Sequence, residues 1–194
     1  MRQTALSIIR SEHRTLTAVM RSLQFLARDA AAETTPPDFD LFTLFLDYIE
    51  MFPNRLHHPK EDEHLFARVR RRSAEAGAVL DTLEAEHRRG EDLTRVLRQL
   101  LARWRLHGAG AATAFAAAVD AYADFQWEHM RKEEDVVMPL AERVLTDEDW
   151  RAVGDAFSAN ADPRLGAQDR QDLEALFQLI LTRAPAPIGL GTST

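Results

Sequence analysis

The stretch HHPKEDEHLF, residues 57–66, begins with two adjacent histidines and places a proline, three acidic residues and a third histidine before an apolar pair. A second stretch, HMRKEEDVVMP at residues 129–139, carries similar residue types in the same order. Aligned on their first histidines, the two stretches pair His57 with His129, Lys60 with Lys132, Glu61 with Glu133, and Phe66 with Met138. A charged surface that only faces water has no need of such a repeat. The two stretches are therefore predicted to hold equivalent positions in a duplicated fold.

The repeat extends to two shorter segments that precede these stretches. SEHRTL at residues 11–16 and AEHRRG at residues 85–90 both contain Glu-His-Arg. His13 and His87 each lie on an apolar stripe with three- and four-residue spacing, which is one face of an α-helix. His129 and Glu133 share such a stripe, one helical turn apart. Each half is predicted as a helix with one inward histidine, a loop, and a helix with the motif H-x-x-x-E.

Hydrophobic periodicity predicts four long amphipathic helices joined by short loops. They are expected at about residues 4–32, from a capping Asp38 onward, at about 75–106 and at about 113–144. Pro53 and Pro59 should kink or restart the second helix, because each removes a backbone donor. The inward stripe of the fourth helix is expected to include Val136 and Leu140. The fold class is thus all-α, an up-down-up-down four-helix bundle.

The pattern weakens after the bundle. A capped start at TDEDW, residues 146–150, predicts a short helix to about residue 159, and a last helix is expected near 171–181. Both should pack on the outside of the bundle. The predicted organisation is a bundle at residues 1–145, a helical extension at 146–184 and a flexible Pro/Gly-rich tail at 185–194.

Composition excludes several classes of protein. At 194 residues, with 45% hydrophobic and 28% charged residues, the chain is predicted to be globular. A formal net charge of −7 argues against nucleic acid or an anionic membrane as partner. The sequence has no cysteine, which excludes disulfides, thiolate metal sites and cysteine nucleophiles. It has no apolar signal core and no apolar run of membrane-spanning length, so the expected location is the cytoplasm.

Two hairpins of this kind, facing each other, would bring four imidazoles and two carboxylates to one depth of the core. An unpaired buried carboxylate costs roughly several kcal/mol unless it is paired or binds a metal. A single histidine on an apolar stripe is more often an ordinary core residue, but the duplicated order favours a dinuclear metal site. Imidazole and carboxylate without sulfur suit iron or manganese, with zinc as an alternative. The predicted ligands are His13, His57, Glu61, His87, His129 and Glu133.

Two further residues are candidates for an additional ligand. Glu91 lies one turn after His87. His58 adjoins His57 and, on an α-helix, would point about 100° away from it, toward the surface or behind the ligands. The prolines leave open which histidine of the pair faces inward, because His58 and Asp62 also have the H-x-x-x-E-like spacing. The overlay of the two halves favours His57.

The pattern H…HxxxE…H…HxxxE resembles the hemerythrin-like, or HHE cation-binding, family over about residues 5–144. The resemblance implies a non-heme di-iron centre inside the bundle, with an oxo or hydroxo bridge between the two ions. By motif, the terminal ligands would be His13, His57, His87 and His129, and the bridging ligands Glu61 and Glu133. Hemerythrins that carry oxygen use a fifth histidine one turn from the ligand on the third helix, where this chain has Leu83 and Glu91.

Two related groups of proteins match only part of this pattern. The four-histidine, two-glutamate set is closer to bacterial proteins implicated in repairing iron–sulfur centres, but those usually have a cysteine-bearing N-terminal segment, and this chain has no cysteine. The ferritin-like di-iron bundle uses E-x-x-H pairs, a spacing found at Glu61–His64 and Glu84–His87. That architecture also needs glutamates in register on the other two helices. Helix one offers only Glu12, off its apolar stripe.

With six-coordinate iron, the implied ligands leave an open position on each metal, where small molecules can react. The favoured function is a di-iron protein that binds or reacts with dioxygen, peroxide or nitric oxide, in stress response or sensing, with peroxidase- or oxidase-like turnover left open. Alternatives are an iron or redox sensor that signals to a protein partner, an oxygen-binding or storage protein, and a structural bundle with a vestigial site. A homodimer is compatible with the sequence. With both metals open, long-lived reversible oxygen binding is not expected.

Overall fold

The structure is a computed structural model that describes residues 2–34, 36–158, 167–185 and 188–190. Within these ranges the chain is helical and contains no strand, which confirms the predicted all-α class. Among the described helices, none combines the length and the apolar character needed to cross a membrane.

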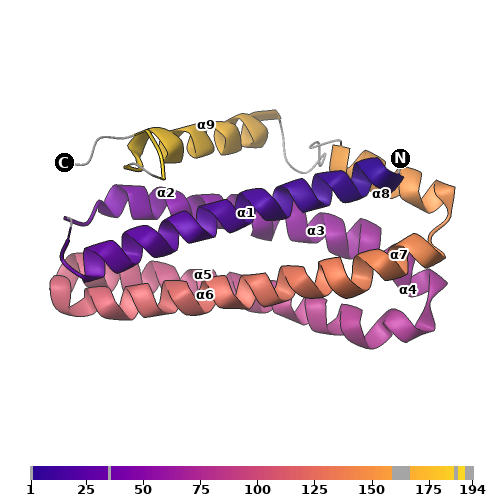
Figure 1. Ribbon diagram of the computed structural model, residues 1–194, viewed down its shortest axis with the longest axis horizontal. Helices are drawn as coiled ribbons and strands as arrows, with labels where there is room; N and C mark the ends of the chain where they lie inside the picture. Colours follow the sequence, from indigo (N-terminus) through magenta and orange to yellow (C-terminus); the bar gives the residue numbers. More distant parts are fainter. Residues whose placement is uncertain (1, 35, 159–166, 186–187, 191–194) are drawn as a thin grey trace.

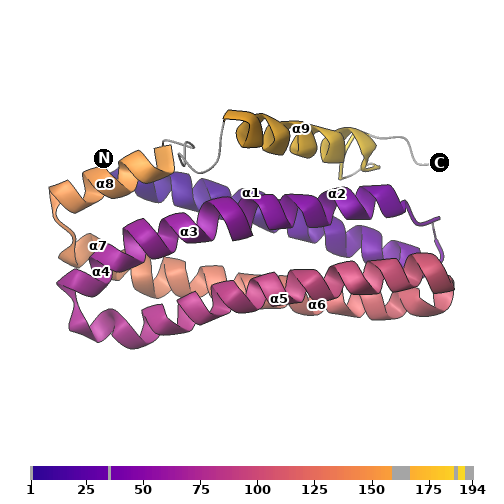
Figure 2. The ribbon, with the colours of Figure 1, turned by 180° about the vertical axis from the view of Figure 1, so that it is seen from behind.

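Four helical arms run alongside one another in up-down-up-down order, as Figures 1 and 2 show. The first arm is α1, Arg2–Ala31. The second is one continuous run of α2 (Phe39–Ile49), η1 (Glu50–His57), α3 (His58–Lys60), η2 (Glu61–Phe66) and α4 (Ala67–Arg72). The third contains η3 (Ala74–Ala76) and α5 (Gly77–His107). The fourth contains η4 (Ala109–Ala111), α6 (Ala112–Lys132), η5 (Glu133–Val137) and α7 (Met138–Val144).

Two further helices lie outside the bundle, as expected (Figure 1). The helix α8, Asp147–Ser158, packs against α1, and α9, Ala167–Arg183, packs against α2. Thr146 and Asp149 cap α8 reciprocally, each accepting a hydrogen bond from the other's backbone N–H. The described α9 is longer than predicted. The division into domains stays a prediction, and residues 186–187 and 191–194 of the predicted tail lie outside the described residues.

Short π-helical segments, η1, η2 and η5, widen the second and fourth arms. Pro59 lies four residues after Arg55 in η1, and Pro139 lies four residues after Asp135 in η5. A proline lacks the N–H and clashes with the carbonyl four residues earlier, so the preceding turn widens while the helix continues. A π turn adds a residue and shifts the face that follows. Val137 is fully buried and Val136 is 46% exposed, so the prediction that Val136 faces the core is wrong.

The apolar core is divided into two clusters with a polar layer between them. One cluster includes Leu16, Phe45 and Trp104. The other includes Ile9 and Phe66, together with apolar residues of α8. Along α1, His13 lies between Ile9 of one cluster and Leu16 of the other. Packed side chains therefore close the polar layer at both ends of the bundle.

Candidate metal centre

Seven histidine and glutamate side chains from all four arms occupy this polar layer. None is more than 5% exposed. They are His13 from α1; His57, His58 and Glu61 from the second arm; His87 from α5; and His129 and Glu133 from the fourth arm. The six predicted ligands are thus buried together with one of the two additional candidates.

The donor atoms of the six predicted ligands form two overlapping groups. Within each group the atoms lie within 4.8 Å of one another. One group contains His13 and His57, the other His87 and His129, and both contain Glu61 and Glu133. Two metal positions that share two carboxylates would require this arrangement.

The carboxylate oxygens divide between the two groups. In Glu61, Oε1 lies 3.3 Å from Nε2 of His57, and Oε2 lies 3.6 Å from Nε2 of His87. In Glu133, Oε2 lies 3.3 Å from Nε2 of His13, and Oε1 lies 3.0 Å from Nε2 of His129. Each carboxylate therefore faces one histidine group with one oxygen and the other group with the second, as a bridging ligand does.

These inward atoms lack ordinary partners. All four carboxylate oxygens of Glu61 and Glu133 are buried without a hydrogen bond, and so are Nε2 of His87 and Nε2 of His129. Leaving a buried donor or acceptor unsatisfied costs about 1–3 kcal/mol, and more for a charged group. Divalent metal ions would satisfy all of these atoms at once, so the residues present fit a dinuclear centre.

The outward nitrogen of each of the four predicted histidine ligands is held by a carboxylate. The Nδ1–H groups donate to these acceptors at 2.7–3.0 Å: His13 to Glu134, His57 to Glu12, His87 to Asp62, and His129 to Glu86. Such partners fix the ring orientation and direct Nε2 toward the centre, where Nε2 of His13 and Nε2 of His57 lie 3.1 Å apart, within hydrogen-bond distance of each other. Each histidine is thus oriented as a ligand before any ion arrives.

These orienting carboxylates were not predicted from the sequence, although a signal was present. Each is the immediate neighbour of a ligand: Glu12 precedes His13, Asp62 follows Glu61, Glu86 precedes His87, and Glu134 follows Glu133. Lys60 binds Glu12 at 3.2 Å, and Lys132 binds Glu86. The repeated lysine, visible in the alignment of the two stretches, therefore has a structural role in holding these carboxylates.

The charges of the centre shift the ionisation of its histidines. Burial disfavours the charged imidazole of His13, but the hydrogen bond to Glu134 and the nearby Glu61 and Glu133 outweigh it and raise its pKa to about 10. Against the same effect of burial, carboxylate partners raise the pKa of His87 to about 10 and that of His129 to about 9. Protons and metal ions therefore compete for these nitrogens, so acid should weaken metal binding.

His58 faces the interior, contrary to the prediction that it points away from the centre. It is 4% exposed and stacks on the His87 ring, with centroids 4.1 Å apart and planes 9° apart. A nitrogen of His58 lies within 4.8 Å of nitrogens of His87 and His129, and its Nδ1 is buried without a partner. Burial and the neighbouring histidines hold its pKa well below the usual range, which keeps the ring neutral. The π-helical segment η1, which ends at His57, turns both adjacent histidines inward.

The other candidates lie away from the centre. Asp62 is half-buried and binds His87 from outside, so the overlay that favoured His57 and Glu61 agrees with the structure. Glu91 is exposed, and its candidacy as an extra ligand is wrong. The buried face of α5 follows alternating steps of three and four residues, Leu80, Leu83, His87, Gly90, Thr94, Leu97, Leu101 and Trp104. On this coiled-coil-like seam the inward position after His87 is Gly90.

The ferritin-like alternative is not formed by the described residues. Glu84 binds Arg70 at 2.8 Å and is 31% exposed, rather than facing the centre with His87. Glu12, the one glutamate that α1 offered to that architecture, binds His57 and Lys60 behind the ligand layer. His64 is half-buried and His107 is exposed.

Comparison with protein families agrees with this geometry. The family model described as the hemerythrin HHE cation binding domain matches residues 4–141, a range that includes all seven residues of the centre. Neither the comparison with curated proteins nor the comparison with solved structures gives a match.

Proposed function

Because the chain belongs to the hemerythrin HHE cation-binding family, we propose that its metal centre holds two iron ions, one beside each histidine group. The observation that carries this proposal is the pair of buried carboxylates, Glu61 and Glu133. Each has both oxygens unpaired, and each faces both groups. Imidazole and carboxylate ligands without sulfur suit iron, with manganese and zinc as alternatives.

The proposed activity is binding of, or reaction with, dioxygen, peroxide or nitric oxide. Iron held here would supply electron transfer and exchangeable coordination toward such molecules. The protein's contribution is to orient four imidazoles through their Nδ1 carboxylates, and to exclude water with an apolar cluster on either side of the layer. Whether the outcome is stress response, sensing, turnover or storage depends on what the reduced protein does with each molecule.

The position of His58 makes the two sides of the centre unequal. His58, His87 and His129 face one metal position, whereas only His13 and His57 face the other. We count His58 as a seventh ligand, so exchange with a small molecule is expected on the two-histidine side. This replaces the expectation of one open position on each metal. It also returns reversible oxygen binding to the outcomes that the test must distinguish.

Metal content and rapid mixing test the proposal. The purified protein, loaded with ferrous iron without air, should retain about two ions per chain after desalting. Mixing with dioxygen, peroxide or nitric oxide in a stopped-flow spectrometer should change the visible spectrum within seconds. Dioxygen that is released again under vacuum would indicate storage, and irreversible oxidation would indicate reaction or sensing. Retention of no metal, or a centre inert to all three molecules, would contradict the proposal.

One observation favours a sensor as the second candidate. In α8, the Phe157 ring lies 6.2 Å from the His57 ring, and Lys60 Nζ lies 4.8 Å from the Phe157 centroid. Lys60 also binds Glu12, which holds His57. A metal-dependent shift of His57 would therefore reach α8 directly. Amide hydrogen exchange with and without iron tests this: a sensor should change protection along α8, and unchanged α8 protection would argue against it.

A further inference from the structure

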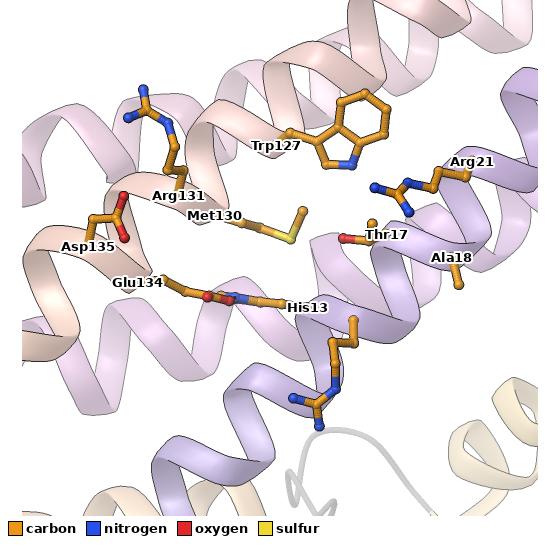
Figure 3. Close-up of a pocket in the computed structure, with 10 residues that line it drawn as sticks. His13, Thr17, Ala18, Arg21, Trp127, Met130, Arg131, Glu134 and Asp135 are labelled. Carbon is orange, nitrogen blue, oxygen red and sulfur yellow. Dashed lines mark hydrogen bonds and ion pairs between the residues drawn. The ribbon is translucent and has the colours of Figure 1, made fainter.

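A pocket of about 480 Å³ lies between α1 and α6, on the two-histidine side of the centre (Figure 3). His13 and Met130 belong to its lining. The α1 residues that line it are spaced by helical turns, as are those of α6, so the pocket follows the groove between these two arms. Its volume is within the range of small-molecule sites in proteins.

Four side chains that line this pocket carry hydrogen-bond donors with no acceptor among the described residues: Arg14, Thr17, Arg21 and Trp127. Figure 3 shows the Arg21 guanidinium, the Thr17 hydroxyl and the Trp127 indole turned toward the space between the arms. The Trp127 Nε1–H is buried without a hydrogen-bond partner. Arg21 lies over the Trp127 ring, 5.9 Å from the centroid, and no carboxylate of the described residues pairs with it. An anion that draws Arg21 off the ring would also open the approach to the indole N–H.

The remaining charges restrict the charge of an occupant. Arg131 is paired with Glu128 at 2.5 Å, and Figure 3 shows it directed away from the space that Thr17 and Arg21 face. The lining also contains Arg14, for which the described residues provide no ion pair, and two acids, Asp135 and the Glu134 that binds His13. The two acids offset part of the positive charge of Arg14 and Arg21, which favours an occupant with a single negative charge over a dianion. One carboxylate can take two parallel hydrogen bonds from Arg21.

The rest of the lining is apolar. Met130, Ala18 and Trp127 all line the pocket, and Figure 3 shows the Met130 side chain below the Trp127 ring. A planar or short aliphatic body fits against a thioether and an indole through dispersion contacts. The site therefore combines one anchor for an anion with a small apolar wall.

We propose that this pocket binds a small carboxylic acid as its monoanion, with the carboxylate on Arg21 and Thr17 and the apolar body against Met130 and Trp127. An occupant would stand between solvent and His13, so it would control the approach of smaller molecules to the two-histidine side of the centre. Its role at the centre rests on the proposed function, but binding itself depends on residues that are not ligands.

Indole NMR provides a direct test, because the chain has three tryptophans and one lies in the pocket. The ¹⁵N-labelled protein, loaded with diamagnetic zinc, is titrated with benzoate and, separately, with benzamide of nearly the same shape. The Trp127 indole resonance should move to saturation with benzoate and stay nearly fixed with benzamide. Trp104 and Trp150 are buried in the two apolar clusters and serve as internal controls.

Matched arginine variants separate recognition from general charge. Arg21→Gln should weaken benzoate binding by about tenfold or more, as expected for loss of a bidentate ion pair. Arg131→Gln, which removes the same charge from a residue directed away, should change it by about twofold or less. Equal binding of benzamide, an unmoved Trp127 resonance, or an unaffected Arg21→Gln variant would overturn the proposal. Three dispersed indole resonances verify that each variant is folded.

The same titration on metal-free protein separates this proposal from the proposed function. Benzoate that binds through Arg21 in a chain that retains no iron or zinc would support the pocket and refute the metal centre. Metal uptake without benzoate binding would refute the pocket alone.

Discussion

The two halves of the bundle, residues 12–62 and 86–134, place the same groups around the centre in the same way. In both halves, one helix carries a Glu-His pair, and the next helix carries a histidine, a lysine and two successive acids. These residues are Glu12, His13, His57, Lys60, Glu61 and Asp62 in the first half, and Glu86, His87, His129, Lys132, Glu133 and Glu134 in the second. The Nδ1 hydrogen bonds and the lysine contacts repeat as well. What the halves share is the set of groups that can hold two ions.

What the halves do not share concerns access. The residue after the H-x-x-x-E histidine is His58 in the first half and Met130 in the second. Two positions before the motif histidine, the first half has Arg55, which is paired with Glu50 at 2.9 Å, and the second half has Trp127. The counterpart of Arg21 is Arg95, which is paired with Asp92. Ion pairs thus engage Arg55 and Arg95, whereas their counterparts beside the pocket between α1 and α6 are Trp127 and Arg21, for which the described residues provide no ion pair. Under the proposed function, the shared residues would hold both ions, and the divergent residues, His58 among them, would make the two sides of the centre unequal.

The largest effect should follow loss of a shared carboxylate. Glu61 and Glu133 each face both histidine groups, so Glu61→Ala and Glu133→Ala should each reduce bound metal from about two ions per chain to well below one. His57→Ala should also remove most of the metal. Metal analysis after reconstitution and desalting measures this, with the exposed His107→Ala as control. A carboxylate variant that kept both ions would show that the halves do not share their ligands.

The second-largest effect should be a lower melting temperature after the metal is removed. Ions that bind the folded chain alone, at about a thousandfold excess over Kd, add roughly 4 kcal/mol, which is about 10 °C for a chain of this size. The polar layer between the two apolar clusters would otherwise keep its buried acceptors unsatisfied. Calorimetry of the iron-loaded and metal-free forms gives the difference. Equal melting temperatures would mean that the two halves do not meet in one site.

Exchanging the divergent residues tests the inequality directly. Met130→His should offer a third imidazole to the two-histidine side and slow nitric oxide binding by about tenfold or more, while Met130→Leu should not. His58→Met should weaken binding of one ion by about tenfold or more. Stopped-flow rates and competition with a chelator measure the two effects. A His58→Met variant with unchanged affinity and unchanged rates would remove His58 from the ligand set.

The orienting carboxylates should matter equally in both halves. Glu12→Gln and Glu86→Gln each leave a histidine with a weaker, uncharged partner, and the loss of metal affinity should be about tenfold for each. Isothermal titration with zinc gives both values under one condition. Values that differ by more than about tenfold from each other would show that the repeated hydrogen bonds do not carry equivalent roles.

The duplicated order was sufficient to predict the four arms and the six residues that the structure brings together. It was sufficient because helical spacing determines which residues share a face, and because a motif that occurs twice in the same order is improbable by chance. His58 and Val136 were assigned to the wrong faces for one reason. Their orientation depends on π turns, which form where a packed helix continues past a proline. Helical periodicity assumes a regular α-helical turn, so it assigns the residues near a π turn to the wrong face. Glu91 was misplaced because the seam of α5 follows a period of about 3.5 residues, so the inward position falls at Gly90.

The last prediction, which leaves metal binding untouched, tests that π turn in the fourth arm. Val137 is fully buried beside the apolar cluster that contains Met138, whereas Val136 is 46% exposed. Val137→Ala should lower the free energy of unfolding by about 2 kcal/mol through the cavity it leaves. Val136→Ala should change it by about 0.5 kcal/mol or less, since the side chain is half in water and alanine favours the helix. Urea unfolding of both variants in the same metal state measures the pair. If Val136→Ala were the costlier change, the arm would run as a regular α-helix through this turn. The residues after Glu133 that face the core would then have to be reassigned. The assignment in the first half, which contains η1 and η2, would not change.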